Sequence, residues 1–253
     1  MLGLAAGCGG GGSSGTSPPP APIAGSLQTL SITARGSGSI YPLYIYLPPD
    51  SAANRATLPV VYLLDGESRF QTLVDIVEAT HTPVIIVGIG NEALRARDYV
   101  PPNLCTGGGG GQAVFFDFIR AELIPFIEAN VGGDPLRRAL LGHSHGGSFV
   151  LYALFAEAAS GHTFHAYLSS DASIGCMKDT VYSWESIYAA FNATLPVRLH
   201  IAYGANLDNG PFIIALQGRH YPGLVLTGQE YAGGHIGMIP AAFTDALAFA
   251  FAA

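Results

Sequence analysis

The chain has 253 residues, of which 49% are hydrophobic and only 11% are charged. One α/β domain of about 200–250 residues is ordinary, so this length can bury a sizeable core without a metal or a disulfide. The formal charge of −7, from 11 Lys and Arg against 18 Asp and Glu, excludes the clustered basic surface typical of nucleic-acid binding and favours uncharged substrates.

Residues 1–25 are predicted to be the end of an export signal followed by a tether. Residues 9–20 contain only Gly, Ser, Thr and Pro, a composition that buries no apolar surface. The preceding LAAGC, residues 4–8, is similar to the lipobox of bacterial lipoproteins, in which Cys8 would carry lipid. Because the apolar run is short and lacks a basic residue, we expect the signal to start upstream. A low-complexity tail with an incidental cysteine is the alternative.

The remaining residues, 26–253, are predicted to form one catalytic domain. A hairpin is expected first, from two runs rich in β-branched and aromatic residues that are separated by a Gly/Ser turn. Continuous apolar runs follow, which are typical of parallel strands covered on both faces. None approaches the roughly 20 apolar residues of a membrane-spanning helix. The expected strands are 27–33, 41–47, 60–64, 84–87, 139–141, 166–168, 199–203 and 224–227.

Three helices are clear from the sequence. Residues 113–130 place apolar side chains at three- and four-residue spacing, with Pro125 expected to kink the helix. Residues 148–158 and 240–252 are the other two, the last opening with a proline. Eight strands, mostly parallel, with helices between them predict a doubly wound α/β sheet with helices on both faces.

Two further cysteines, Cys105 and Cys176, remain if Cys8 is lipidated. An exported protein could oxidise them to a disulfide. Two unpaired thiols are the alternative, because the sequence does not give the distance between their Cα atoms.

The motif GHSHGG, residues 142–147, carries the strongest chemical signal. It follows an expected strand and precedes an expected helix, which is the strand–turn–helix context of the G-x-S-x-G nucleophile elbow. Gly142 and Gly146 permit the tight turn, and Ser144 would stand at a helix N-terminus that favours developing negative charge. We predict Ser144 as the nucleophile; a glycine-rich turn with an incidental serine is the alternative.

A nucleophilic serine needs a general base, and His235 lies between the last strand and the last helix, where this chain order predicts it. The glycines before His235 let the loop fold its imidazole over Ser144. His143 and His145 flank the serine and are expected to point away from its Oγ. A metal site on these two histidines is disfavoured, because neither a carboxylate nor a third histidine stands at ligand spacing.

The acid that orients the histidine is expected after the strand 199–203. Asp208 is our prediction there, and Asp171, after the preceding strand, is the rival. A Ser–His dyad without an acid is a third reading. The oxyanion of the tetrahedral intermediate needs backbone donors, for which we predict the N–H groups of Glu67 and His145.

These residues resemble the Putative esterase family of α/β hydrolases, which includes enterochelin-esterase-like, S-formylglutathione-hydrolase-like and mycolyltransferase-like members. The resemblance implies the α/β-hydrolase fold and metal-free, cofactor-free ester hydrolysis through an acyl-enzyme, and it supports Ser144 and His235. It fails at the acid, because the slot three residues after Gly204 holds Leu207. The matching segments are residues 59–66 (PVVYLLDG), 97–101 (RDYVP), 118–127 (FIRAELIPFI), 142–147 (GHSHGG) and 234–235 (GH).

The sequence therefore predicts an exported serine esterase, either a periplasmic or cell-surface lipoprotein or a secreted protein. Its expected partner is a small-molecule or polymer-linked ester, with no nucleic acid and a membrane tether through Cys8. An acyltransferase on the same site and a degenerate, non-catalytic binding protein are the alternatives. The fold and the elbow are shared by many specificities, so the natural ester is left open.

Overall fold

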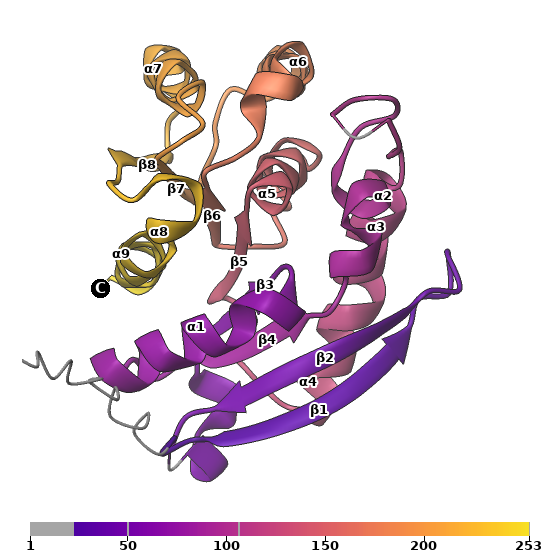
Figure 1. Ribbon diagram of the computed structural model, residues 1–253, viewed down its shortest axis with the longest axis vertical. Helices are drawn as coiled ribbons and strands as arrows, with labels where there is room; N and C mark the ends of the chain where they lie inside the picture. The colour runs from indigo at the N-terminus through magenta and orange to yellow at the C-terminus, as the bar shows by residue number, and fades with distance from the viewer. Residues whose placement is uncertain (1–22, 50, 106, 253) are drawn as a thin grey trace, which may run out of the picture.

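The computed structural model describes residues 23–49, 51–105 and 107–252 (Figure 1). Within them, eight strands form one sheet in the order β1-β2-β4-β3-β5-β6-β7-β8. Of the predicted signal and tether, residues 1–22, Cys8 among them, lie outside the described residues, whereas residues 23–25 are described. The strands are β1 (Ser26–Thr33), β2 (Ile40–Leu47), β3 (Val60–Leu63), β4 (Ile85–Ile89), β5 (Arg138–His143), β6 (Ala166–Ser170), β7 (Arg198–Tyr203) and β8 (Val225–Glu230).

The sheet is mixed only at its β1 end. β1 pairs with β2, and β2 with β4, in antiparallel register, whereas every other neighbouring pair is parallel. This confirms the predicted edge hairpin and the mostly parallel sheet. The apolar runs of β3 and β4 are fully buried, as expected for strands covered on both faces.

Helices cover both faces of the sheet. On one face α1 and α9 lie side by side (Figure 1), and Phe70 and Phe243 pack there with Val61 and Leu63 of β3. Tyr62, between those two residues of β3, points into the larger core on the opposite face with α3, α5, α6 and α7. The helices are α1 (Gly66–Thr80), α2 (Arg95–Tyr99), α3 (Gln112–Phe118), α4 (Ile124–Asn130), α5 (His145–Phe155), α6 (Lys178–Phe191), α7 (Asn209–Arg219), α8 (Gly234–Gly237) and α9 (Ile239–Phe251).

The three predicted helices are present, with shifted bounds. The helix expected over residues 113–130 is α3 and α4 joined by a π-helical segment, Ile119–Leu123. Pro125 stands two residues after Leu123, the end of this segment, and has no N–H to donate to the preceding turn, which accounts for the change of hydrogen-bond pattern. The long helices α1, α6 and α7 were missed, although each carries apolar residues at helical spacing on the face that it buries.

One stretch of the described residues, Gly234–Phe251, has the length and composition of a membrane-spanning helix. It comprises α8 and α9, and the face of α9 that carries Ile239, Phe243 and Leu247 is buried against the sheet. The stretch therefore has the packing of a core helix.

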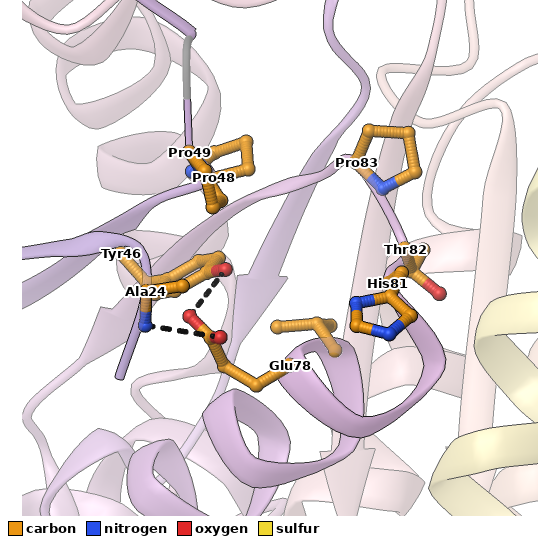
Figure 2. A pocket seen from close by; sticks show the side chains of 9 residues that line it. Ala24, Tyr46, Pro48, Pro49, Glu78, His81, Thr82 and Pro83 are labelled. Atoms are coloured by element: carbon orange, nitrogen blue, oxygen red, sulfur yellow. Dashed lines mark hydrogen bonds between the residues drawn. The ribbon is translucent and has the colours of Figure 1, made fainter. Parts of the chain in front are cut away.

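The described chain begins at the edge of the sheet where α1 ends. Glu78 accepts hydrogen bonds from the N–H groups of Ala24 and Gly25, at 3.1 and 2.9 Å, and from the Tyr46 hydroxyl, at 2.9 Å. Figure 2 shows the contacts of Ala24 and Tyr46 with Glu78 in a hollow that is also lined by Pro48, Pro49 and Pro83. α1 begins after β3, at the carboxyl ends of the parallel strands, where Ser144 also lies. The hollow lies at the other end of α1 and is therefore remote from Ser144.

Candidate active site

Ser144 stands alone between β5 and α5. Its backbone has φ 61° and ψ −123°, a conformation that residues with a side chain rarely adopt. Its N–H donates to the carbonyl of Ser170 at 2.9 Å, which ties the turn to the end of β6. A strained, half-buried serine at the head of a helix is the geometry that the elbow motif predicts.

The glycines of the elbow are not equivalent. A Cβ on Gly142 would lie 2.4 Å from the carbonyl oxygen of Gly146, so only glycine fits at that position. A Cβ on Gly146 would make only ordinary contacts, the nearest at 3.5 Å from Oδ2 of Asp65. The prediction for Gly142 is confirmed, whereas the turn does not itself require glycine at 146.

His235 is held by a carboxylate from another strand. Its Nδ1 lies 2.5 Å from Oδ2 of Asp171, the residue that directly follows β6. Asp171 is fully buried, while the His235 side chain is 38% exposed. Gly233 and Gly234, with φ values of 102° and 65°, shape the chain before the histidine. Asp171 therefore fixes which nitrogen of His235 faces inward and leaves Nε2 for other partners.

Asp171 is surrounded by amide donors at the end of β7. The N–H groups of Gly204, Ala205 and Asn206 donate to its Oδ1 at 2.8, 3.2 and 3.0 Å, and the Asn206 side chain donates to Oδ2 at 3.1 Å. Burial raises the pKa of Asp171, but the hydrogen bonds from His235, Gly204 and Asn206 outweigh it and lower the pKa below its usual value. The carboxylate is thereby kept ionised beside the histidine.

Asp208, the acid predicted from the sequence, does not contact His235, and that expectation is wrong. Its carboxylate pairs with Nζ of Lys178 at 3.0 Å on an exposed surface. The sequence argument placed the acid after β7, but the residues there are the amides that surround the rival candidate Asp171. The available signal was the aspartate directly after β6, whose carboxyl end meets that of β5 at the same edge of the sheet.

His143 packs against His235, with 4.5 Å between the two ring centroids. Its side chain is buried, and its Nδ1 lies 3.1 Å from Oγ of Ser170. Burial and the neighbouring His235 and Arg69 lower the pKa of His143 to about 3, so the ring is neutral near pH 7. The ring meets the other histidine of the site, a contact that sequence reasoning missed.

The two predicted oxyanion donors begin helices. Glu67 lies in the first turn of α1, and His145 is the first residue of α5. First-turn N–H groups have no acceptor within their own helix, and the helix dipole favours negative charge there. Gly66, the residue before Glu67, directly follows Asp65, and His145 directly follows Ser144. Asp65 and Ser144 both have positive φ.

Buried polar groups support the turn before Glu67. Asp65 accepts two hydrogen bonds from Arg95, at 3.2 and 3.0 Å, and its own N–H donates to the Tyr99 hydroxyl at 3.2 Å. Tyr99 in turn donates to Asn91. Burial raises the pKa of Asp65, and Arg95 partly offsets this effect. The pairing holds the main chain of this turn, where one predicted oxyanion donor lies.

A second serine and a disulfide complete the surroundings of Ser144. Oγ of Ser173 lies 3.3 Å from Oγ of Ser144, and the Ser173 N–H donates to the Ser144 carbonyl at 3.3 Å. Three residues on, Cys176 is bonded to Cys105 of the glycine-rich loop after α2. The pairing that the sequence left open is therefore formed. Within the described residues, no group of three or more His, Cys, Asp or Glu could hold a metal ion.

Comparison with known proteins identifies the family. The sequence model of a family described as "Putative esterase" matches residues 37–172, more than half of the chain. The chain belongs to this esterase family. The resemblance inferred from the motifs is thus confirmed.

Two relatives are named as esterases of triacetylfusarinine C and of ferri-bacillibactin. The chain is 34% identical to the siderophore triacetylfusarinine C esterase of Aspergillus fumigatus over 63% of its own length, and it spans 60% of that protein. It is 27% identical to the ferri-bacillibactin esterase BesA of Bacillus subtilis, over 87% of both chains. Among solved structures, the IroE-like serine hydrolase from Shewanella oneidensis has a TM-score of 0.79 at 25% identity, over 88% of this chain and 79% of that one. The predicted α/β-hydrolase fold is confirmed.

Proposed function

We propose that the protein hydrolyses carboxylic esters through an acyl-enzyme on Ser144, with His235 as general base and Asp171 as the acid that orients it. The observation that carries this proposal is the contact of 2.5 Å between Nδ1 of His235 and Oδ2 of Asp171. A buried, ionised carboxylate on Nδ1 leaves Nε2 as the nitrogen that takes a proton, and it stabilises the imidazolium that results. A protein that kept the fold but lost its acid would not retain this pair.

The reaction proceeds in two halves. His235 takes the proton of the Ser144 hydroxyl as Oγ attacks the ester carbonyl, and the N–H groups of Glu67 and His145 stabilise the oxyanion. The imidazolium then gives the proton to the departing alcohol, which leaves the acyl group on Ser144. In the second half, water attacks the acyl-enzyme with His235 again as base, and the imidazolium returns the proton to Oγ of Ser144 as the acid product leaves.

The substrate class that we propose is the ester bonds of siderophores. The support comes from two relatives, a triacetylfusarinine C esterase and a ferri-bacillibactin esterase. The half-buried Ser144 and the partly exposed His235 agree with an open site that reaches an ester within a larger molecule.

We propose further that the protein works outside the cytosol. The disulfide between Cys105 and Cys176 is the structural support, because such bonds persist in oxidising compartments and are rare in the cytosol. The predicted lipid on Cys8 belongs to the same proposal. Mass spectrometry of the protein from its native host would test it, since an unlipidated cytosolic chain would contradict it.

The test of catalysis compares the full chain with its Ser144→Ala variant. We expect the wild type to cleave p-nitrophenyl acetate and purified bacillibactin, and to be labelled once by a fluorophosphonate. Ser144→Ala should lose at least about 10³-fold in rate and all labelling, because the acyl-enzyme cannot form. A variant with near wild-type turnover, or a folded wild type that is neither active nor labelled, would refute the proposal.

The same assay separates hydrolysis from acyl transfer. Adding methanol or glycerol to the reaction offers an acceptor alcohol in competition with water, and chromatography counts the two products. We expect the free acid to dominate at low acceptor concentration. Dominance of the transferred ester would favour the acyltransferase.

A further inference from the structure

His143 has no role in the reaction proposed above, yet its ring lies against that of His235. The two centroids are 4.5 Å apart, with an angle of 41° between the ring planes. Because His143 ends β5, it stands directly before the nucleophile and beside the base. It is the aromatic ring in contact with the imidazole of His235 in the described part of the chain.

The position of the His143 ring is itself fixed. Its Nδ1 lies 3.1 Å from Oγ of Ser170, and Ser170 pairs with His143 across β5 and β6. The side chain is only 2% exposed, so it has little freedom to turn away. Ser170 also precedes Asp171, so one strand end holds both the acid and the support of the His143 ring.

The chemistry requires that His143 be neutral. During each half-reaction His235 becomes an imidazolium, and a second cation at this distance would oppose that step. Burial, together with the neighbouring His235, Arg69 and Arg95, lowers the pKa of His143 to about 3, although Asp171 acts in the opposite direction. The chain can therefore place an aromatic face beside the general base without a competing charge.

The geometry also carries an energetic cost. Nε2 of His143 is buried and has no hydrogen-bond partner among the described residues. An unsatisfied buried donor or acceptor destabilises a protein, so an apolar residue would serve the core better. A residue kept at such a cost beside catalytic groups points to a role in function.

We propose that His143 is a positioning residue, whose ring is the platform that keeps the imidazole of His235 turned toward both Asp171 and Ser144. This inference rests on the proposed function, because it concerns the same general base. His143 does not exchange a proton with the substrate. It limits the rotation of His235 about its side-chain bonds, so that Nδ1 keeps its carboxylate partner while Nε2 changes partners during the reaction.

Three full-length variants test the proposal. His143→Phe keeps an aromatic face and loses the bond to Ser170, whereas His143→Asn keeps a polar atom for Ser170 and loses the face. The matched control is His200→Asn, because His200 is also 2% exposed and neutral, its pKa lowered to about 4 by burial, but its ring packs against Phe249 of α9. We measure kcat, KM, the fluorophosphonate labelling rate and the proton resonance of His235 Nδ1–H.

We expect His143→Asn to lower kcat by about 10- to 100-fold with little change in KM, since small misplacements of catalytic groups have effects of this size. The Nδ1–H resonance should shift upfield and broaden as the contact with Asp171 loosens. His143→Phe should retain more kcat than His143→Asn. His200→Asn should lower the melting temperature. Its kcat should stay within about twofold of the wild type, and the Nδ1–H resonance of His235 should not shift.

Three results would overturn the proposal: wild-type kcat in His143→Asn, an unshifted resonance in that variant, or equal loss in His143→Phe and His143→Asn. If His143→Asn does not fold, His143→Leu replaces it, because this side chain fills the buried space without an aromatic face and carries the same expectations for kcat and for the resonance. Failure of the proposed function is a different outcome, in which wild type and Ser144→Ala behave alike.

Discussion

Oδ2 of Asp171, at the end of β6, lies 2.5 Å from Nδ1 of His235, 64 residues further along the chain. β7 separates β6 from β8, the strand that leads to His235. The backbone amides at the end of β7 bind the other carboxylate oxygen. The acid is thus supplied by one strand and held by the next.

Asp171→Asn should remove most of the activity, whereas Asp208→Asn should not. An amide at 171 favours the wrong tautomer of His235, and the analogous change in a serine protease lowers kcat by about 10⁴-fold. Asp208 makes one exposed ion pair with Lys178, so its replacement should change kcat less than about twofold. Steady-state kinetics of the two variants check both expectations. Equal losses of kcat in the two variants would mean that Asp208 takes part in catalysis.

Gly142→Ala and Gly146→Ala should differ in stability. The methyl group at 142 would overlap the backbone of residue 146, which cannot move without displacing the elbow, so we expect a loss of more than about 2 kcal/mol. The methyl group at 146 meets only van der Waals neighbours, and the change should stay within about 1 kcal/mol. Urea unfolding measures both free energies. Equal destabilisation would contradict the unequal role of the two glycines.

Removing the disulfide should lower both stability and activity. Cys105 and Cys176 are 71 residues apart, and closing a loop of this length contributes about 4 kcal/mol by restricting the unfolded chain. Activity should also fall, because Cys176 lies three residues from Ser173, which contacts Ser144. The double variant Cys105→Ser, Cys176→Ser should show both effects in urea unfolding and steady-state kinetics.

A reducing agent supplies the control for that prediction. It should reproduce both effects in the wild type and add nothing to the double variant. A wild type whose stability and kcat are insensitive to reduction would show that the bond neither restricts the unfolded chain nor steadies the segment beside Ser144.

Stability should fall as the pH falls from about 6.5 toward 4. Burial lowers the pKa of His143 to about 3 and of His200 to about 4, whereas both titrate near 6.5 once unfolded. In this window the unfolded chain binds more protons, so each histidine lowers the unfolding free energy by up to about 1.4 kcal/mol per pH unit. The lowered pKa of Asp171 acts only below its ordinary value near 3.8.

Urea unfolding at pH 7, 6, 5 and 4.5 measures this slope. His200→Asn removes one of the histidines whose pKa is lowered by burial, so its slope should be lower than that of the wild type by up to the same amount per pH unit. If the variant and the wild type show the same dependence of unfolding free energy on pH, then His200 takes up its proton in the folded state over the same pH range as in the unfolded chain.

The sequence by itself determined the eight strands, the edge hairpin, the elbow serine and the histidine before the last helix. Each of these depends on neighbours in the chain: apolar runs without polar alternation, glycines around Ser144, and the position of His235 between a strand and a helix. The family followed from the order of such local motifs. Helices α1 and α6 were missed, although the buried residues of α1, Phe70, Leu73, Val74 and Val77, stand at the three- and four-residue spacing of an amphipathic helix.

Only the tertiary structure decided the acid, the disulfide and the neighbours of His235. Asp171 and Asp208 both follow strands at the same edge of the sheet, and their distance in sequence from His235 does not distinguish them. Asp171 lies beside His235 because amides at the end of β7 hold its buried carboxylate there, while Lys178 draws Asp208 to the surface. Contacts between residues far apart in the chain depend on the spacing and twist of the strands, which local pattern does not encode.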